Sequence, residues 1–388
     1  MDDNNRSGVI EKDSPVPVYR QVEEHLKQSI ASGYLQACQR MPSTRELCRQ
    51  FDISTTTAVL ALKSLVNDGF AYTVQGKGTF VADRKKDRPV IGLVIPHLIL
   101  NKDVEMARYD AKHFVPLVHF IEDEARKSGA DILLCLDNDS PENEKENILK
   151  LLQRGVDGII IYYIGGESNL KYIRQIKAAG IPLVLIDRSI DGIDVDYVTT
   201  DNFSGAYKAT RFLLESRCPA DYYLFTNAEK CNANTERERG FQRALLDSGQ
   251  AILGSSIKSA SCYTNLEDIE YNARYDEEIY CLAKTLAGKN RDVPLGIFAI
   301  NSPILVGVWE ALKEMRINRS NLTLACFDEP PLAIPEEVPF AIVLQPLEEI
   351  GRQSVRIVTE KLAGEKEIQR IVLPPVVKVV NEGRALPI

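Results

Sequence analysis

From Val90 to the end of the chain, short apolar runs alternate with stretches of helical periodicity. The apolar runs, typical of buried strands, occupy residues 90–95, 132–136, 158–162, 182–186, 222–225, 294–299 and 322–327. The helical stretches between them occupy residues 114–128, 142–154, 168–179, 204–214, 236–246, 276–287 and 304–315. Such an alternation predicts an α/β fold with parallel sheets covered on both faces. Because one core rarely exceeds ~250–300 residues, this region is expected to form two lobes.

The charge of the chain is distributed unevenly. Residues 14–88 contain 11 Lys and Arg against 7 Asp and Glu, a net charge of +4, whereas residues 89–388 have a net charge of −10. The whole chain, at −8, is too acidic to coat nucleic acid with its entire surface. A small basic module therefore precedes a large acidic one. Residues 1–13 are expected to be a flexible N-terminus, and the charged stretch 83–89 a linker.

The basic module, residues 14–82, has the pattern of three helices followed by a hairpin. Apolar side chains recur every four residues over 18–30, which is one face of a helix that Gly33 would end. Ser43 and Glu46 have the spacing of a capping box, which starts a short second helix. Ser54 would cap a third helix, and two helices joined by so short a turn can place the second in the DNA major groove.

The hairpin is predicted from residues 70–74 and 79–82, which are β-rich and flank the turn sequence Gln75-Gly-Lys-Gly78. Helices and hairpin together give a winged helix-turn-helix. Segments 17–22, 30–33, 41–47 and 75–81 of this module resemble the DNA-binding domain of GntR-family repressors. The residues expected at the DNA are Ser43, Thr44, Arg45, Ser54, Thr55, Thr56, Thr57, Gln75, Gly76, Lys77 and Gly78.

The resemblance implies that Arg45 reads a guanine edge, whose two acceptors match a guanidinium, and that the wing glycines approach the minor groove. The alternative is that Arg45 only pairs with Glu46 or Glu24, although a phosphate would also bind beside a helix N-terminus. This chain departs from the family at two frequent arginine positions, which are Thr55 and Val59 here. The operator is therefore expected to differ from the common family consensus.

Six segments of the acidic module, in order, resemble the effector domain of lac-repressor-type regulators, itself similar to periplasmic ribose-binding protein. They are residues 180–188, 198–206, 237–241, 297–301, 326–328 and 345–351. The resemblance implies a type I periplasmic-binding-protein-like domain over 90–388. Lobe 1 would hold about 90–201 and 346–372, and lobe 2 about 202–345 and 373–388. The ligand would lie between the lobes, at the carboxyl ends of the strands, in contact with Phe114, Asp187, Arg188, Arg237, Asn301, Asp328 and Gln345.

These residue types suit a neutral monosaccharide. Carboxylates accept hydrogen bonds from hydroxyls, a guanidinium donates to vicinal oxygens, amides do both, and Phe114 could stack on the sugar ring. A sugar phosphate is the alternative, since two arginines are present, but the two aspartates would repel it. A pentose or deoxyhexose such as arabinose or fucose is therefore favoured.

Each candidate also has a structural alternative. Asp187 and Arg188 could form a hinge ion pair, Arg237 could pair with an adjacent glutamate on its helix, and Phe114 could be plain core. Asp328 and Asn301 could be turn or cap residues. The chain also departs from lac-type regulators after Asn301, where Ser302-Pro303 replaces the usual aspartate. Residues 97–113 are long for a strand-to-helix connection and could form a lid that touches the ligand through Asn101, Asp103 or Tyr109.

No sequence feature indicates export, a membrane span or a cofactor. The longest apolar run, residues 90–100, contains Pro96 and His97 and is shorter than the ~20 residues that a membrane helix needs. The N-terminal residues lack the regions of a signal peptide. Eight scattered cysteines and four histidines show no metal-ligand spacing. A cytoplasmic protein with reduced thiols, no metal and no cofactor is expected.

The resulting hypothesis is a transcription regulator that binds double-stranded, palindromic operator DNA as a homodimer and responds to a sugar effector, most simply as a repressor. An activator remains open as an alternative. A pyridoxal-phosphate enzyme of the aminotransferase-fused type is disfavoured, because its domain would need roughly 100 more residues, and no catalytic set is apparent. A transport binding protein is disfavoured by the N-terminal module.

Overall fold

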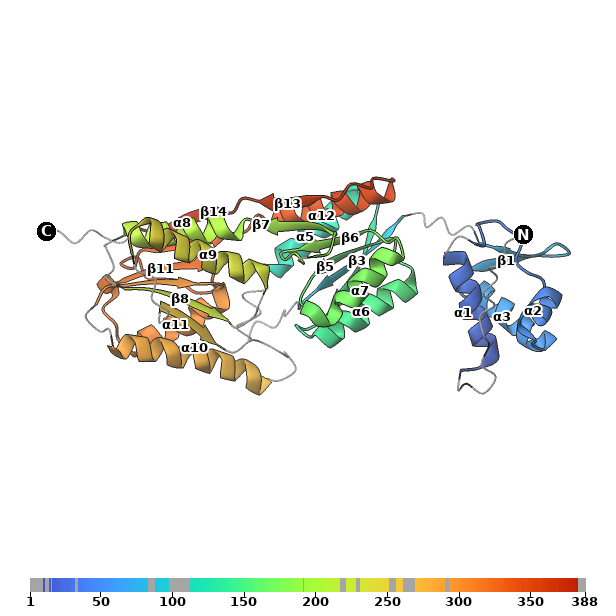
Figure 1. Ribbon diagram of the computed structural model, residues 1–388, viewed down its shortest axis with the longest axis horizontal. Coiled ribbons are helices and arrows are strands. Elements are labelled where there is room, and N and C mark those ends of the chain that lie inside the picture. Colours follow the sequence, from blue (N-terminus) through green and yellow to red (C-terminus); the bar gives the residue numbers. More distant parts are fainter. Residues whose placement is uncertain are drawn as a thin grey trace. The chain divides into compact units, whose positions relative to one another are not determined.

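A computed structural model describes residues 10, 14, 16–31, 34–82, 88–97, 112–190, 192–216, 221–227, 231–250, 256–260, 269–289 and 293–382. The chain divides into two units, Met1–Arg88 and Pro89–Ile388, which Figure 1 shows coloured from blue to red along the sequence. Gly33, most of the predicted linker (83–87) and the central part of the predicted lid (98–111) lie outside the described residues.

The first unit is the predicted winged helix-turn-helix. Its elements are α1 (Val18–Ala31), α2 (Thr44–Phe51), α3 (Thr55–Asn67), β1 (Ala71–Val74) and β2 (Gly78–Val81). The capping box at Ser43 and the cap at Ser54 are both present, so the helices begin where the sequence predicts. Val22, Leu47 and Leu65 are fully buried in the core that joins the three helices to the hairpin. The two strands pair antiparallel.

The second unit contains two six-stranded sheets, each of which forms the centre of one lobe. The first sheet is entirely parallel and has the order β13-β7-β6-β5-β3-β4. Its strands are β3 (Val90–Ile95), β4 (Asp131–Leu136), β5 (Gly158–Tyr162), β6 (Leu183–Ile186), β7 (Asp196–Thr200) and β13 (Arg370–Leu373). Helices α5 (Phe114–Lys127), α6 (Pro141–Arg154), α7 (Gly166–Ala178) and α12 (Leu347–Leu362) complete this lobe, which has two buried apolar clusters.

The second sheet has the order β14-β12-β11-β10-β8-β9. Its strands are β8 (Asp221–Asn227), β9 (Ile257–Ala260), β10 (Leu295–Ala299), β11 (Leu322–Phe327), β12 (Phe340–Leu344) and β14 (Val376–Asn381). The helices of this lobe are α8 (Asn202–Glu215), α9 (Asn232–Asp247), α10 (Ile269–Lys289) and α11 (Ser302–Glu314), with a 3-10 turn, η2, at Arg319–Asn321. Five strands are parallel as predicted, but the edge strand β14 pairs antiparallel with β12.

The chain passes between the lobes at three places. It crosses from β7 into α8, returns from β12 into α12, and crosses again from β13 to β14, so each lobe is built from discontinuous segments (Figure 1). Thr200 and Gln345 lie at the first two crossings, and the Thr200 hydroxyl donates to Gln345 Oε1 at 2.7 Å. The crossings therefore converge on a common hinge region. Within the described residues, none of the helices combines the length and apolar character needed to cross a bilayer.

Candidate functional site

The predicted DNA-contacting residues of α2 lie at its first turn. The Ser43 hydroxyl accepts from the Glu46 amide, and the Glu46 carboxylate accepts from the Ser43 amide at 2.6 Å. These hydrogen bonds from Ser43 lower the pKa of Glu46, which stays ionised at the helix N-terminus. Arg45 is exposed, and among the described residues it forms no ion pair, so the pairing with Glu46 or Glu24 considered above is absent there. Thr44 borders a groove between the helices and the wing.

The helix α3 begins with hydroxyl side chains that have two different roles. Ser54 Oγ accepts from the Thr57 amide at 3.1 Å and lies 2.8 Å from Thr57 Oγ1, so these two hydroxyls hold the helix cap. Thr55 and Thr56 are exposed. Of the four predicted hydroxyl contacts, therefore, two are engaged in local structure and two face outward.

The wing presents Gln75, Gly76 and Lys77 at an exposed tip. Gly76 and Gly78 have φ values of +75° and +113°, which an L side chain rarely adopts, so the turn requires glycine at both positions. Arg40 lies against this turn, because a Cβ at Gly78 would be 3.1 Å from Arg40 Nε. Arg40 is not one of the predicted DNA-contacting residues, because it lies more than 30 residues before the wing and no sequence pattern connects the two.

In the second unit, Asp187 and Asp328 occupy equivalent positions in the two lobes. Each follows a buried strand, β6 or β11, and each adopts a left-handed conformation, with φ values of 67° and 65°. The Asp187 amide donates to Val198 O at 3.1 Å, and the Asp328 amide donates to Val343 O at 2.9 Å. Both side chains are buried at the carboxyl edges of their sheets, as predicted for residues that meet a ligand there.

Asp328 is connected to the hinge and to the opposite lobe. Gln345 Nε2 donates to Asp328 Oδ1 at 2.9 Å, which extends the bond from Thr200. From lobe 1, His113 Nδ1 lies 3.6 Å from the same carboxylate oxygen. Lys112 Nζ forms a second contact between the lobes, 2.7 Å from Glu329 Oε1.

A small cavity lies between these groups, with a volume of about 50 Å³. It is lined by Lys112, His113, Asp328, Glu329, Leu344, Gln345 and Leu347. A cavity of about 10–15 Å³ on this measure holds one water, so this space admits only a few waters and is too small for a sugar ring. The ion pair and the His113 contact hold the lobes close together, and a sugar would require them to separate or these side chains to rearrange.

Arg237 is buried and its guanidinium is largely engaged by protein groups. Nε donates to Asn202 Oδ1 at 2.7 Å, Nη1 donates to Ile300 O at 2.9 Å, and the guanidinium carbon lies 3.8 Å from the centre of the Phe327 ring. Asn202 in turn donates to Thr200 O at 3.0 Å. Arg237 is thereby fixed to the hinge network and is not paired with the adjacent glutamates among the described contacts.

Asn301 caps α11, since its Oδ1 accepts from the Ile304 amide at 3.1 Å. This is the cap role considered above, and it directs one end of the amide into local structure while the other end can still donate. The next residue, Ser302, has a fully buried hydroxyl for which no partner exists among the described residues.

Arg188 and Phe114 belong to an aromatic part of lobe 1. Arg188 Nε lies 3.6 Å from Asp187 Oδ2, and its guanidinium carbon lies 5.4 Å from the centre of the Tyr162 ring. Phe114 is 3% exposed and packs edge-to-face against His113, His97 and Tyr162. Phe114 thus lies in the core of the lobe, the alternative considered from the sequence, while its neighbour His113 faces the cavity.

Sequence reasoning missed several members of this cleft: Lys112, His113, Glu329, Thr200, Asn202 and the pair Ser189–Asn232. The Asn232 side chain bonds to both the amide and the hydroxyl of Ser189, at 3.2 and 2.5 Å. Asn202 and Thr200 lie within residues 198–206, one of the six segments that resemble lac-repressor-type regulators, so this segment could have indicated both residues. Asn101, Asp103 and Tyr109 lie outside the described residues.

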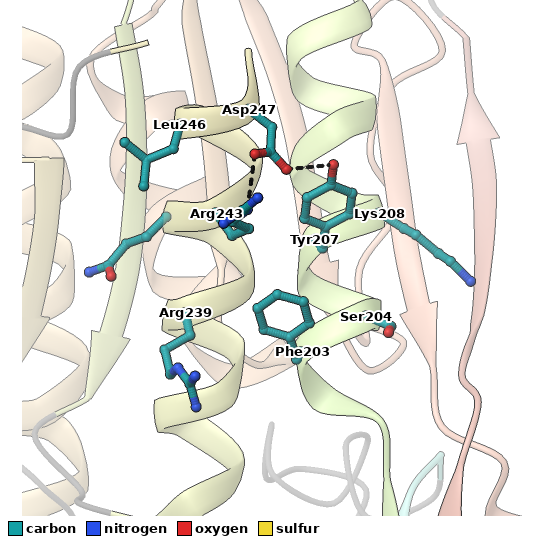
Figure 2. A pocket seen from close by; sticks show the side chains of 9 residues that line it. Phe203, Ser204, Tyr207, Lys208, Arg239, Arg243, Leu246 and Asp247 are labelled. Carbon is teal, nitrogen blue, oxygen red and sulfur yellow. Dashed lines mark hydrogen bonds and ion pairs between the residues drawn. The ribbon is translucent and has the colours of Figure 1, made fainter. Parts of the chain in front are cut away.

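A wider groove, open to solvent, lies elsewhere, between α8 and α9, with a volume of about 600 Å³. Figure 2 shows Tyr207 and Arg243 turned toward Asp247, which they contact at 3.1 and 2.9 Å. None of the seven predicted effector residues lines this groove. The charged groups that meet at its centre are already paired, so the cleft near Asp328 remains the better candidate for a sugar.

Comparisons with known proteins agree with both parts of the fold. The model of the bacterial regulatory proteins of the gntR family matches residues 18–81, and the model of the periplasmic binding protein domain matches residues 106–366. An arabinose metabolism transcriptional repressor of Halalkalibacterium halodurans is 24% identical over 353 residues, which cover 90% of each chain. The transcriptional repressor NagR of Bacillus subtilis is 45% identical over 84 residues, which cover 22% of this chain and 35% of NagR.

Solved structures share the fold at low sequence identity. The transcriptional regulator CelR in complex with cellobiose has a TM-score of 0.61 at 18% identity and covers 87% of this chain and 94% of its own. The Caulobacter myo-inositol binding protein, bound to myo-inositol, has a TM-score of 0.61 at 18% identity and covers 76% of this chain and 95% of its own. At these identities the likeness establishes the architecture alone.

Proposed function

The chain belongs to the periplasmic binding protein domain family and carries a gntR-family regulatory domain in front of it, and from this we propose that it is a sugar-responsive transcriptional repressor. The observation that carries the proposal is the joining, in one chain, of a winged helix-turn-helix to two lobes whose hinge is bonded to the predicted ligand residues Gln345 and Asp328. A ligand that binds one lobe arrangement better than another would shift the population of arrangements.

We propose a neutral sugar as the effector, with a pentose such as arabinose as the first candidate. The carboxylates of Asp187 and Asp328 accept hydrogen bonds from hydroxyls, and Arg188 donates them. Two relatives of similar length are named as repressors of arabinose metabolism, which supports the choice. A sugar phosphate is less suited, because Glu329 adds a second carboxylate to that of Asp328 in the lining of the small cavity.

The effector proposal is tested by calorimetric titration and thermal shift with arabinose, ribose, fucose and the corresponding sugar phosphates. Binding of a free sugar is expected, and Arg188→Ala should abolish it while operator binding persists. Arg174→Ala, an exposed arginine on α7, is the matched control. Binding of the phosphates alone would refute a neutral effector, and loss of sugar and DNA binding together in Arg188→Ala would indicate misfolding.

We further propose that the chain binds a palindromic operator as a homodimer, with Arg45 reading a guanine. The expected cost of Arg45→Ala is about 1–3 kcal/mol on the operator, with little loss on random DNA. Equal losses on both would make Arg45 a phosphate contact. The increase in operator Kd relative to Arg174→Ala measures the effect.

The edge strand β4 offers a surface for the second copy. Leu134 and Leu136 project from one face of this strand and are 37% and 39% exposed. Exposed apolar side chains on a sheet edge are a liability unless another chain covers them. Replacing both with Glu should give a monomer in sedimentation, whereas Val376→Glu, on the exposed edge strand β14, should leave a dimer. If Val376→Glu gave a monomer and the double replacement in β4 left a dimer, the interface would lie at β14 instead.

A further inference from the structure

The recognition helix α3 lacks the side chains that usually read purines and cytosine. From Ser54 to Leu60 the sequence is Ser-Thr-Thr-Thr-Ala-Val-Leu, so the first turns contain only hydroxyl and aliphatic groups, and Lys63 is the first charged residue of the helix. A bidentate contact to guanine needs Arg or Lys, one to adenine needs Asn or Gln, and cytosine is read by a carboxylate. None of these is available in the two turns that a recognition helix points at base edges.

The structure shows which of the remaining groups face outward. Ala58 and Ala61 are fully buried against the rest of the unit, while Thr55, Thr56 and Leu60 are exposed, Leu60 by 47%. Thr56 and Leu60 are four residues apart and therefore share one face of the helix. The exposed surface of the first two turns is accordingly rich in methyl groups.

We propose that this face recognises the 5-methyl groups of thymines in the major groove, so that the operator half-site contains thymines opposite Thr56 and Leu60 beside the guanine that Arg45 reads. Thymine is the one base that presents a methyl group in this groove, and threonine methyls and aliphatic side chains are its apolar partners. Hydroxyls can bond to any base and add little discrimination. The inference rests on the proposed DNA-binding function and specifies the chemistry of its partner.

The experiment begins with selection of a binding site from random DNA by the full-length protein. Each thymine of the enriched half-site is then replaced by deoxyuridine, which lacks only the methyl group. Since burial of one methylene-sized group corresponds to roughly a fourfold change in affinity, the thymines read by α3 should each show about that loss. Thymines elsewhere in the site should change by less than twofold.

Variants assign the effect to the helix. Thr56→Ser keeps the hydroxyl and removes the methyl, so it should weaken binding to the thymine site and cause no further loss on the corresponding deoxyuridine site. Leu60→Ala should behave in the same way at its own position. Thr285→Ser, an exposed threonine of the second unit, is the matched control. Circular dichroism verifies that each variant is folded.

Two outcomes separate the inference from the function beneath it. If a sequence is enriched but deoxyuridine at every position leaves Kd within twofold, or if the losses on deoxyuridine and in Thr56→Ser simply add, methyl recognition by α3 is wrong and the DNA-binding function stands. If no sequence is enriched over random DNA, the proposed function itself fails, and the inference with it.

Discussion

At the scale of single residues, two aspartates combine conformational strain with a predicted ligand role. Asp187 and Asp328 have positive φ values, a conformation that costs non-glycine residues about 1–3 kcal/mol and that clusters at functional sites. Their amides donate to the neighbouring strands, which holds the strained turns in place. Asp and Asn tolerate this region better than other side chains because they can bond locally. Each carboxylate is therefore held in a fixed position at the carboxyl edge of its sheet.

This geometry predicts that Asp328→Asn separates folding from effector binding. Asn tolerates the same φ value and still accepts from Gln345 through its amide oxygen, so the thermal midpoint should change little. The charge is lost while an acceptor remains, and charged hydrogen bonds contribute about 1 kcal/mol more than neutral ones, so sugar affinity should fall roughly fivefold in calorimetry. Asp194→Asn, an exposed aspartate of lobe 1, should leave affinity unchanged. Unchanged affinity in Asp328→Asn would remove this residue from the effector site.

A third aspartate, Asp137, predicts a pH dependence of stability. Its side chain is fully buried, one oxygen accepts from the Asp139 amide at 3.0 Å, and the other has no partner among the described residues. Burial, reinforced by the nearby Glu144, raises the pKa of Asp137 to about 9. The folded chain therefore keeps this proton up to about pH 9, whereas the unfolded chain loses it near pH 4. Stability is then lost as pH rises through this interval.

Asp137→Asn mimics the protonated carboxyl and should remove that dependence. Relative to the original protein, its free energy of unfolding in denaturant titrations should rise steadily from pH 5 to pH 8, with a slope of at most about 1.4 kcal/mol per pH unit. Asp123→Asn is the control, because the bond from Lys127 lowers the pKa of this half-buried carboxyl and it stays ionised over the same range. If the stabilities of Asp137→Asn and the original protein changed with pH in the same way, the raised pKa of Asp137 would be contradicted.

At the scale of elements, the sequence predicted the strongly patterned segments and missed those stabilised by distant partners. Seven strands (β3, β4, β5, β6, β8, β10 and β11) and the capped helices were predicted to within a few residues, whereas the buried strands β7 and β12 were not predicted as strands. Strands β13 and β14 were also missed. They are short apolar runs on either side of Pro374-Pro375, they carry exposed valines at the sheet edges, and they pair with β7 and β12. Helix α12 was not predicted as a helix. Only its first turn was noted, within the segment 345–351 that begins at the predicted ligand residue Gln345. Lys112 and His113 contact lobe 2 because the fold brings distant parts of the chain together, and no local sequence pattern predicts these contacts.

Helix α12 also supplies a test of element packing. A Cβ at Gly351 would lie 2.9 Å from Phe120 Cβ and 3.1 Å from the Ile121 amide nitrogen, so α12 and α5 approach too closely for alanine. Gly351→Ala should therefore destabilise the protein by about 1–3 kcal/mol in thermal unfolding. Gly288→Ala, in α10, meets only Met315 Cε at 3.6 Å and should stabilise by about 0.4–1 kcal/mol. If Gly351→Ala and Gly288→Ala had equal effects on stability, the contact between α12 and α5 would be able to relax around the added methyl group.

At the scale of the whole molecule, regulation requires that the sugar distinguish between two arrangements of the lobes. Among the described residues, the contacts that join the lobes near the cleft include Lys112–Glu329, His113–Asp328 and Ser189–Asn232. The exposed Lys112–Glu329 ion pair contributes about 0–1 kcal/mol, so this pair biases the arrangement without locking it. A sugar that competes for Asp328 can then shift the population, and the basic unit needs no contact with the sugar to respond.

Thermodynamic linkage makes this coupling measurable from both ends. If saturating sugar raises the operator Kd by some factor, saturating operator must raise the sugar Kd by the same factor, expected at roughly 5–150-fold for a coupling of about 1–3 kcal/mol. Fluorescence titrations in both orders measure the two factors at fixed salt, because DNA affinity falls steeply with ionic strength. Asp328→Asn is measured at a sugar concentration that saturates the original protein but not the variant. At this concentration, the sugar should change the operator affinity of the variant less than that of the original protein. A sugar that binds the cleft but leaves the operator Kd unchanged would show that the two units are not coupled, whatever each of them binds.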